Sequence, residues 1–177
     1  MGERAPTAHA CHGPAGIVIF GPRIATENTA LYYFAYGSNM DWPQMRQRCP
    51  TARFACVARL PDYRFAIARH SRLRNCGTAN ILLAMGGEVW GIVYDVSDRD
   101  LATLDSFEDG YRREKVFVYD RNDGHDPIEV LVYIAAREDL VPLPNPDYKR
   151  LILAGARHWR LPQDYCAMLE RIEVTNP

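Results

Sequence analysis

Short runs of residues with high β-propensity, spread between residues 31 and 135, constrain most strongly what this chain can fold into. Each run is rich in Val, Ile, Tyr and Phe and is bounded by turn-forming residues, which is typical of strands in a small sheet or barrel. The runs cover residues 31–37, 54–60, 63–69, 78–85, 88–96, 115–120 and 128–135. Many strands at short intervals, with few helices, predict a small α+β barrel.

The segments between these runs predict turns and helices. Gly86-Gly87 is expected to join two strands as a hairpin turn, and residues 121–127 are expected to join two more. Apolar residues at helical spacing predict three helices and a fourth that begins at Pro162. The first three are expected near residues 42–48, 98–108 and 147–158.

The length of the chain sets the number of domains. With 177 residues, the chain can build one full hydrophobic core and is too short for two ordinary domains. Residues 1–30 are rich in Ala, Gly, Pro and Thr without a sustained period, so we expect a flexible leader with one edge strand at residues 16–20. Residues 31–177 are then expected to form a single domain.

Charge and cysteine content narrow the class of protein. A formal net charge of −1 gives no overall attraction to nucleic acid or to membrane surfaces. No apolar stretch approaches the roughly 20 residues of a membrane helix, and residues 16–20 lack the flanks of a signal peptide. We therefore expect a cytoplasmic protein with no nucleic-acid or membrane partner. Reduced thiols fit this expectation, because no CxxC pair is formed by Cys11, Cys49, Cys56, Cys76 and Cys166.

The stretch "YFAYGSNM" at residues 33–40 is the first candidate for a functional site. A buried strand is expected to run through a bend at Gly37 into a helix that Asp41 caps. The first N–H groups of that helix would suit a carboxylate or a developing oxyanion, and Gly37 would permit a backbone conformation that other residues resist. An ordinary strand-to-helix turn is the alternative. Ser38 is a poor candidate for a nucleophile, since the GxSxG pattern is missing.

The second candidate lies at residues 97–114, "SDRDLATLDSFEDGYRRE". Ser97 and Asp100 form a capping pair, and Leu101 and Leu104 mark the buried face of the predicted helix. One further turn along that face reaches Glu108, whose partial burial would raise its pKa and suit it to proton transfer. Equally, Phe107 could be the core residue and Glu108 could point to solvent.

Other motifs are missing or carry little information. No phosphate-loop, dinucleotide, HExxH or paired-cysteine zinc pattern occurs, and the histidines have no ligand-like spacing, so we expect no metal site. Residues 68–74, "ARHSRLR", form the one basic cluster. It is expected to be a solvated loop between two strands, with the path of an acidic substrate as the alternative.

Taken in order, "YFAYGSNM", "EVWGIVYDV", "LDSFEDGY" and "PDYKRLILAGARHWRLPQDY" resemble the γ-glutamylcyclotransferase family, and particularly its YGSN branch. The resemblance spans roughly residues 31–173. It implies a small mixed β-barrel flanked by helices. It also implies an enzyme that converts a γ-glutamyl amine or amino acid into 5-oxoproline and the freed amine, without cofactor or metal.

The resemblance also assigns residues. It implies that Glu108 is the catalytic acid and base, and that the glutamyl end is bound by Tyr36, Gly37, Ser38, Asn39 and Met40. Around the pocket it places Tyr111, Tyr133 and Tyr148. Two alternatives stay open: a binding module for γ-glutamyl ligands that has lost the reaction, and a cyclotransferase for a specialised γ-glutamyl amine. The expected partner is a small γ-glutamyl molecule, and a homodimer is left open.

Overall fold

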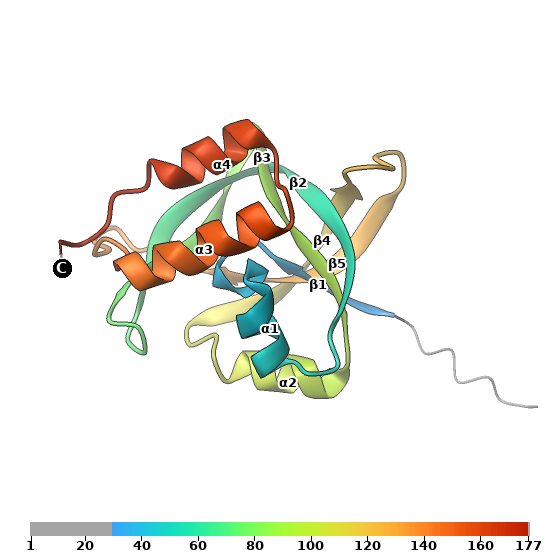
Figure 1. Ribbon diagram of the computed structural model, residues 1–177, viewed down its shortest axis with the longest axis horizontal. Helices are drawn as coiled ribbons and strands as arrows, with labels where there is room; N and C mark the ends of the chain where they lie inside the picture. The colour runs from blue at the N-terminus through green and yellow to red at the C-terminus, as the bar shows by residue number, and fades with distance from the viewer. Residues whose placement is uncertain (1–29, 177) are drawn as a thin grey trace, which may run out of the picture.

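The computed structural model describes residues 30–176 (Figure 1). Its strands are β1 (Leu31–Ala35), β2 (Arg53–Ser71), β3 (Cys76–Val96), β4 (Tyr111–Asp120) and β5 (Pro127–Ala135). Its helices are the 3₁₀ turn η1 (Ser38–Met40), α1 (Trp42–Arg48), α2 (Asp98–Asp105), α3 (Pro146–His158) and α4 (Gln163–Glu170). The expected leader, with its strand at residues 16–20, falls outside the described residues.

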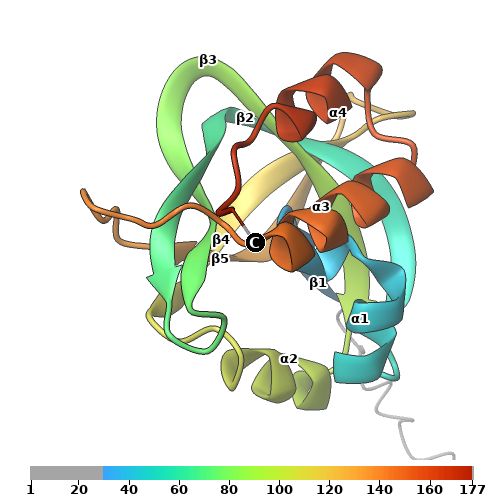
Figure 2. The same ribbon diagram turned by 60° about the vertical axis from the view of Figure 1, so that its left-hand side comes forward.

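The strands close into a barrel in the order β1-β3-β2-β4-β5, which confirms the predicted α+β barrel. Strand β1 closes it, pairing antiparallel with β3 and parallel with β5. The predicted connection at residues 121–127 is correct, since β4 and β5 pair antiparallel on either side of it. Figure 2 shows α3 and α4 together on one side of the barrel and α2 at its lower edge. The barrel encloses the core, whose largest fully buried side chains include Tyr94, Phe34, Leu60, Ile81 and Ile92.

Two long bent strands replace four of the predicted short ones. The runs at 54–60 and 63–69 form β2, and those at 78–85 and 88–96 form β3. The predicted hairpin at Gly86-Gly87 is therefore wrong. Both strands continue through a register shift there, where the Asp62 carboxylate accepts a hydrogen bond from the Gly86 N–H at 2.9 Å. A glycine pair in a strand pattern marks a bulge as well as a turn, and here tertiary pairing with β2 decides for the bulge.

Local signals set the ends of the helices. The expected cap of α1 is present, with the Asp41 side chain accepting from the Gln44 N–H at 3.0 Å. Ser97 and Asp100 form the expected capping box of α2. Helix α3 packs closely on η1, because Gly155 has no side chain and lies against the backbone of Met40. This contact anchors the segment that follows β1, where the candidate site begins.

Candidate active site

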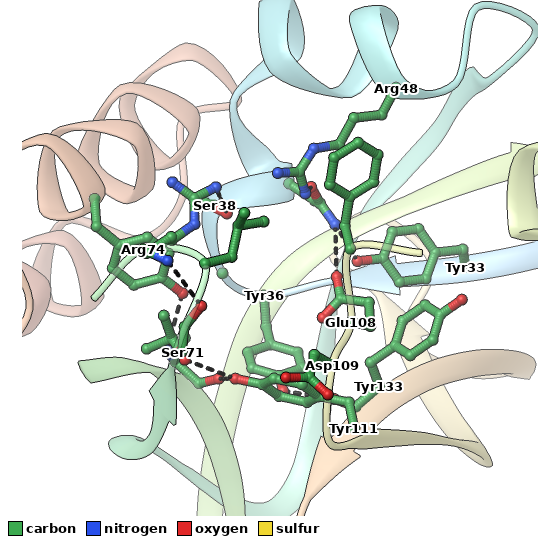
Figure 3. Close-up of a pocket in the computed structure, with 17 residues that line it drawn as sticks. Tyr33, Tyr36, Ser38, Arg48, Ser71, Arg74, Glu108, Asp109, Tyr111 and Tyr133 are labelled. Carbon is green, nitrogen blue, oxygen red and sulfur yellow. Dashed lines mark hydrogen bonds between the residues drawn. The ribbon is translucent and has the colours of Figure 1, made fainter. Parts of the chain in front are cut away.

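A pocket lies where the end of β1, the loop between β2 and β3, and the turn after α2 meet (Figure 3). Figure 3 shows Arg74 on the left of the pocket, with Arg48 and Glu108 on the right. The lining residues are Tyr33, Tyr36, Gly37, Ser38, Asn39, Arg48, Ser71, Leu73, Arg74, Thr78, Ala79, Phe107, Glu108, Asp109, Tyr111, Tyr133 and Tyr148. The pocket thus combines aromatic walls, two arginines and acidic side chains.

The YGSN segment enters the pocket by a route that differs from the prediction. Strand β1 leads into the 3₁₀ turn η1 before α1 begins, and Asp41 already caps α1. The pocket is lined by Gly37 and by Ser38 and Asn39 of η1, rather than by the first turn of α1. The first N–H groups of η1, on Ser38 and Asn39, are the ones that have no partner within their own helix. Gln44 holds this turn in place, because its side-chain amide donates to the Ser38 carbonyl at 2.9 Å.

Gly37 lies where the pocket leaves little space for a side chain. Its φ of −111° is negative, so Gly37 does not adopt the left-handed conformation that favours glycine. A Cβ at this position would lie 3.2 Å from the Ala79 Cβ and 3.4 Å from the Tyr148 hydroxyl. Glycine therefore lets the β1 end approach β3 and α3 closely at the pocket.

Glu108 points into the pocket, although the helix predicted over residues 98–108 is too long. Helix α2 ends at Asp105, and Glu108 lies in the turn before β4. Its Oε1 accepts from the Asn39 side-chain amide at 3.3 Å. The alternative with Phe107 in the core is wrong, since Phe107 is 39% exposed and Glu108 is half-buried.

Arg69 and Gly110 shape the turn that carries Glu108. The Arg69 guanidinium donates to the Asp109 carbonyl at 3.3 Å and pairs with Glu138. Gly110 has a φ of +77°, and a Cβ there would lie 2.0 Å from the Arg69 guanidinium. The glycine therefore permits both the left-handed turn and the approach of Arg69. As a result, the carboxylate is positioned from two sides, by its own turn and by Asn39.

Burial brings the pKa of Glu108 close to neutral pH. Desolvation raises the pKa of Glu108 to about 7, while Arg48, the Asn39 amide and Arg74 act to lower it. A group with a pKa near the working pH is well suited to accept a proton and later return it. Arg48 itself has a lowered pKa because of its burial, with Arg74 acting in the same direction.

The tyrosines of the pocket differ in whether their hydroxyl groups donate a hydrogen bond to the protein. Tyr36 donates to the Tyr133 carbonyl at 2.6 Å, Tyr111 to the Ala79 carbonyl at 2.6 Å, and Tyr133 to Asp105 at 2.8 Å. Tyr148 instead accepts from the Ala79 N–H at 2.9 Å. Its own proton, like that of Tyr33, has no acceptor among residues 30–176 and is available to a ligand. Burial, the main cause, raises the pKa of all these hydroxyls, so they are donors at neutral pH.

The structure brings most of the expected site residues together. The pocket is lined by Tyr36, Gly37, Ser38, Asn39, Glu108, Tyr111, Tyr133 and Tyr148. Met40 lies outside it: its side chain is fully buried, and its carbonyl accepts from the Trp159 indole at 2.9 Å.

Two lining arginines were not among the expected site residues. Arg74 belongs to the basic cluster at residues 68–74. The alternative role considered for that cluster, along the path of an acidic substrate, therefore pointed to Arg74. Its guanidinium donates to Gln44 at 3.0 Å and to the Ser38 hydroxyl at 3.4 Å. Arg48 carried no comparable signal, because it reaches the pocket only through the tertiary packing of α1.

The described residues contain no cluster of three or more His, Cys, Asp or Glu side chains that could hold a metal ion. Within the same part of the chain, no helix is long and apolar enough to cross a membrane. Cys49, Cys56, Cys76 and Cys166 are free thiols. The groups that the pocket itself offers are carboxylates, two arginines and several hydroxyls.

Comparison with known sequences identifies relatives over most of the chain. The sequence model of the family described as gamma-glutamyl cyclotransferase, AIG2-like, matches residues 33–161. A gamma-glutamylcyclotransferase of Mus musculus is 31% identical over 169 residues, covering 92% of this chain and 85% of the relative. One of Homo sapiens is 32% identical over 155 residues, covering 83% of this chain and 81% of the relative.

Solved structures show the same similarity. A structure of a gamma-glutamyl cyclotransferase aligns with a TM-score of 0.76 at 31% identity, covering 84% of this chain and 90% of that one. YkqA from Bacillus subtilis shares the fold, with a TM-score of 0.66 at 24% identity, over 81% of this chain and 54% of that one. Fold, sequence and family model thus agree, and the chain belongs to the γ-glutamyl cyclotransferase, AIG2-like, family.

Proposed function

We propose that this chain is a γ-glutamylcyclotransferase that converts a γ-glutamyl substrate into 5-oxoproline and a free amine, with Glu108 as general base and then general acid. The observation that carries the proposal is the position of Glu108. One half-buried carboxylate with a pKa of about 7 lies in the pocket that the YGSN segment lines. The family membership of the chain supports the same reaction.

The first step requires a base. The substrate's own α-amine attacks its γ-carbonyl carbon, so the protein mainly has to fold the substrate into the ring-closing geometry. An α-amino group has a pKa of about 8 and is mostly protonated at neutral pH. Ionised Glu108 takes that proton and frees the amine's lone pair for attack. A new C–N bond then forms, and the γ-carbonyl oxygen becomes an oxyanion.

The second step requires an acid and hydrogen-bond donors. Protonated Glu108 returns its proton to the departing nitrogen as the old C–N bond breaks, so the nitrogen does not leave as an anion. The regenerated Glu108 carboxylate then takes the surplus proton of the ring nitrogen and passes it to the freed amine, which leaves as an ammonium ion. Donors for the oxyanion or for the substrate carboxylate are available from the first N–H groups of η1 and from the uncommitted Tyr148 hydroxyl. Arg48 and Arg74 add positive charge that favours an anionic substrate.

The identity of the leaving amine is tested directly by a substrate panel. Purified protein is incubated with γ-glutamyl amino acids, a γ-glutamyl polyamine and glutathione, and 5-oxoproline and free amine are quantified. We expect equimolar release of both products from at least one member. Binding of γ-glutamyl ligands without any 5-oxoproline would support the alternative of a non-catalytic module.

Cellular setting and assembly are further parts of the proposal. A cytoplasmic location is in keeping with the free thiols of the four described cysteines. Imaging of the tagged full-length chain tests this location. The homodimer that the sequence left open is tested by light scattering on the eluting protein.

A further inference from the structure

The Asn39 side chain links Arg48 to Glu108. Its oxygen accepts from the Arg48 guanidinium at 2.9 Å and from the Gln44 side-chain amide at 3.3 Å. Its nitrogen donates to the Tyr33 hydroxyl at 2.9 Å and to Glu108 Oε1 at 3.3 Å. Asn39 is buried, so all these contacts form away from bulk water.

Arg48 fixes which way the Asn39 amide faces. The oxygen and nitrogen of an amide have similar size, and the alternative orientation would turn the oxygen toward Glu108. The Tyr33 hydroxyl can donate or accept. The Gln44 amide is held by the Ser38 carbonyl and the Arg74 guanidinium, so its nitrogen faces Asn39 and supports the same orientation. A guanidinium can only donate. Arg48 therefore holds the Asn39 oxygen on its own side, whatever the protonation state of Glu108.

A second contact places Arg48 against the same turn. Its guanidinium carbon lies 4.2 Å from the ring centroid of Phe107, the residue before Glu108. A cation–π contact of this kind attracts the positive charge of the arginine to the face of the ring. Arg48, at the end of α1, thus contacts the turn at Phe107 and reaches Glu108 through Asn39.

We propose that Arg48 is a positioning residue of the cyclotransferase reaction, which orients the Asn39 amide toward Glu108 and keeps that carboxylate ionised until it accepts the proton of the substrate amine. The inference rests on the proposed function, because it takes Glu108 to be the general base. It assigns to Arg48 no contact with the reacting atoms.

The charges that face Glu108 support this role. Against the effect of burial, which raises the pKa of Glu108, Arg48 is the strongest opposing group, followed by Asn39 and Arg74. Asp105 acts in the same direction as burial. Asp109 lines the same pocket as a further acidic group. Neutral tyrosines complete the surroundings of the carboxylate, namely Tyr33, Tyr36, Tyr111, Tyr133 and Tyr148. Loss of Arg48 should therefore raise the pKa of Glu108 further.

A titration of Glu108 tests the inference without relying on turnover. The carboxyl signal is followed by ¹³C NMR and assigned by its loss in Glu108→Gln. We expect a midpoint of about 7 in the wild type and a rise of about one pH unit or more in Arg48→Gln. Arg48→Lys, which keeps the charge, should shift by less than about half a unit. Arg48→Met, with a similar aliphatic stem, replaces the Gln variant if that variant does not fold.

Arg46→Gln is the matched control, because Arg46 lies on the same helix but is exposed and faces the Trp42 ring at 5.8 Å. Its Glu108 titration should match the wild type.

In Arg48→Gln the acid limb of kcat/KM for 5-oxoproline release should move to higher pH. Relative to the wild type, kcat/KM of Arg48→Gln should be about tenfold lower near pH 6, and the difference should be smaller near pH 9.

The two proposals fail in different ways. If the wild type releases 5-oxoproline but the Glu108 midpoint is the same in Arg48→Gln and Arg48→Met as in the wild type, this inference is overturned and the proposed function stands. A wild type that releases no 5-oxoproline from any γ-glutamyl substrate overturns the proposed function. A uniform loss of kcat/KM across the pH range would reduce Arg48 to a structural role.

Discussion

Gly37 shows how a single residue without a side chain can shape the pocket. Its φ of −111° is negative, and β3 and α3 approach it so closely that a Cβ would contact Ala79 and Tyr148. Contacts of 3.2 and 3.4 Å are tight, and a β-branched side chain would add atoms that have no room. The residue therefore keeps the YGSN segment close to the uncommitted Tyr148 hydroxyl.

Enlarging Gly37 should impair catalysis more than folding. We expect Gly37→Val to lower kcat/KM at least tenfold, about 1.4 kcal/mol, because the Tyr148 hydroxyl and the η1 amides are displaced. Gly37→Ala, which needs a shift of a few tenths of an ångström, should have a smaller effect. Steady-state kinetics and thermal melting measure both variants. Native kcat/KM in a folded Val variant would remove this segment from the mechanism.

The residues that the sequence identified and those it missed differ in the kind of signal they carry. Glu108 and the YGSN residues stand in motifs, so resemblance to a family was enough to select them. Arg48 has no such signal: it lies at the end of α1, 60 positions before Glu108, and only tertiary packing brings it to the turn. Met40 was selected with its motif, yet its side chain is needed in the core.

At the scale of elements, helix and strand types were predicted better than their ends. The periodicity of α2 suggested one more turn, but the chain leaves the helix after Asp105. The turn that follows is held by Gly110 and by the contact of Arg69 with the Asp109 carbonyl. Such long-range contacts are invisible in a helical period. The same holds at Gly86, where pairing with β2 turned a predicted hairpin into a bulge.

The contact between α3 and η1 gives a prediction for one element. A Cβ on Gly155 would lie 2.4 Å from the Met40 backbone carbon, and backbone cannot rotate away as a side chain can. We expect Gly155→Ala to lower the free energy of unfolding by about 1–3 kcal/mol despite the better helix propensity of Ala. It should also reduce turnover, because η1 would be displaced from the pocket.

Chemical denaturation together with a turnover assay checks this prediction. Gly124→Ala is the control, since its new Cβ would meet only the Asp120 carbonyl oxygen, at an ordinary distance of 3.5 Å. Its effect should stay within about 0.5 kcal/mol. Equal stability of the two variants would show that α3 can move away from η1 without cost.

For the molecule as a whole, the buried carboxylate is a cost to stability. The pKa of Glu108 is raised from 4.5 to about 7 in the folded state, so the folded protein binds more protons than the unfolded chain between these values. The contribution of Glu108 to stability is therefore fully present below pH 4.5 and is lost as pH rises through about 7. A carboxylate that is retained for catalysis at a cost to stability would show this dependence of stability on pH.

Glu108→Gln should reveal this cost. Relative to the wild type, the variant should gain stability as pH rises from 4 to 8, by on the order of 2–3 kcal/mol. Urea denaturation of both proteins across this range measures the difference, and titrations of other groups largely cancel in it. A difference that stays flat with pH would mean that the folded protein does not raise the pKa of Glu108.

The turnover of Glu108→Gln, measured as 5-oxoproline release from the best substrate of the panel, tests the central claim most directly. Gln keeps the size of the side chain and can still face Asn39, but it cannot carry the proton. Fold and ligand binding should survive, whereas turnover should fall by about 10²- to 10⁴-fold. Glu129→Gln, an exposed carboxylate of β5 that pairs with Lys115, should retain native turnover. A folded Glu108→Gln variant that keeps more than about a tenth of native turnover would show that Glu108 is not the general base.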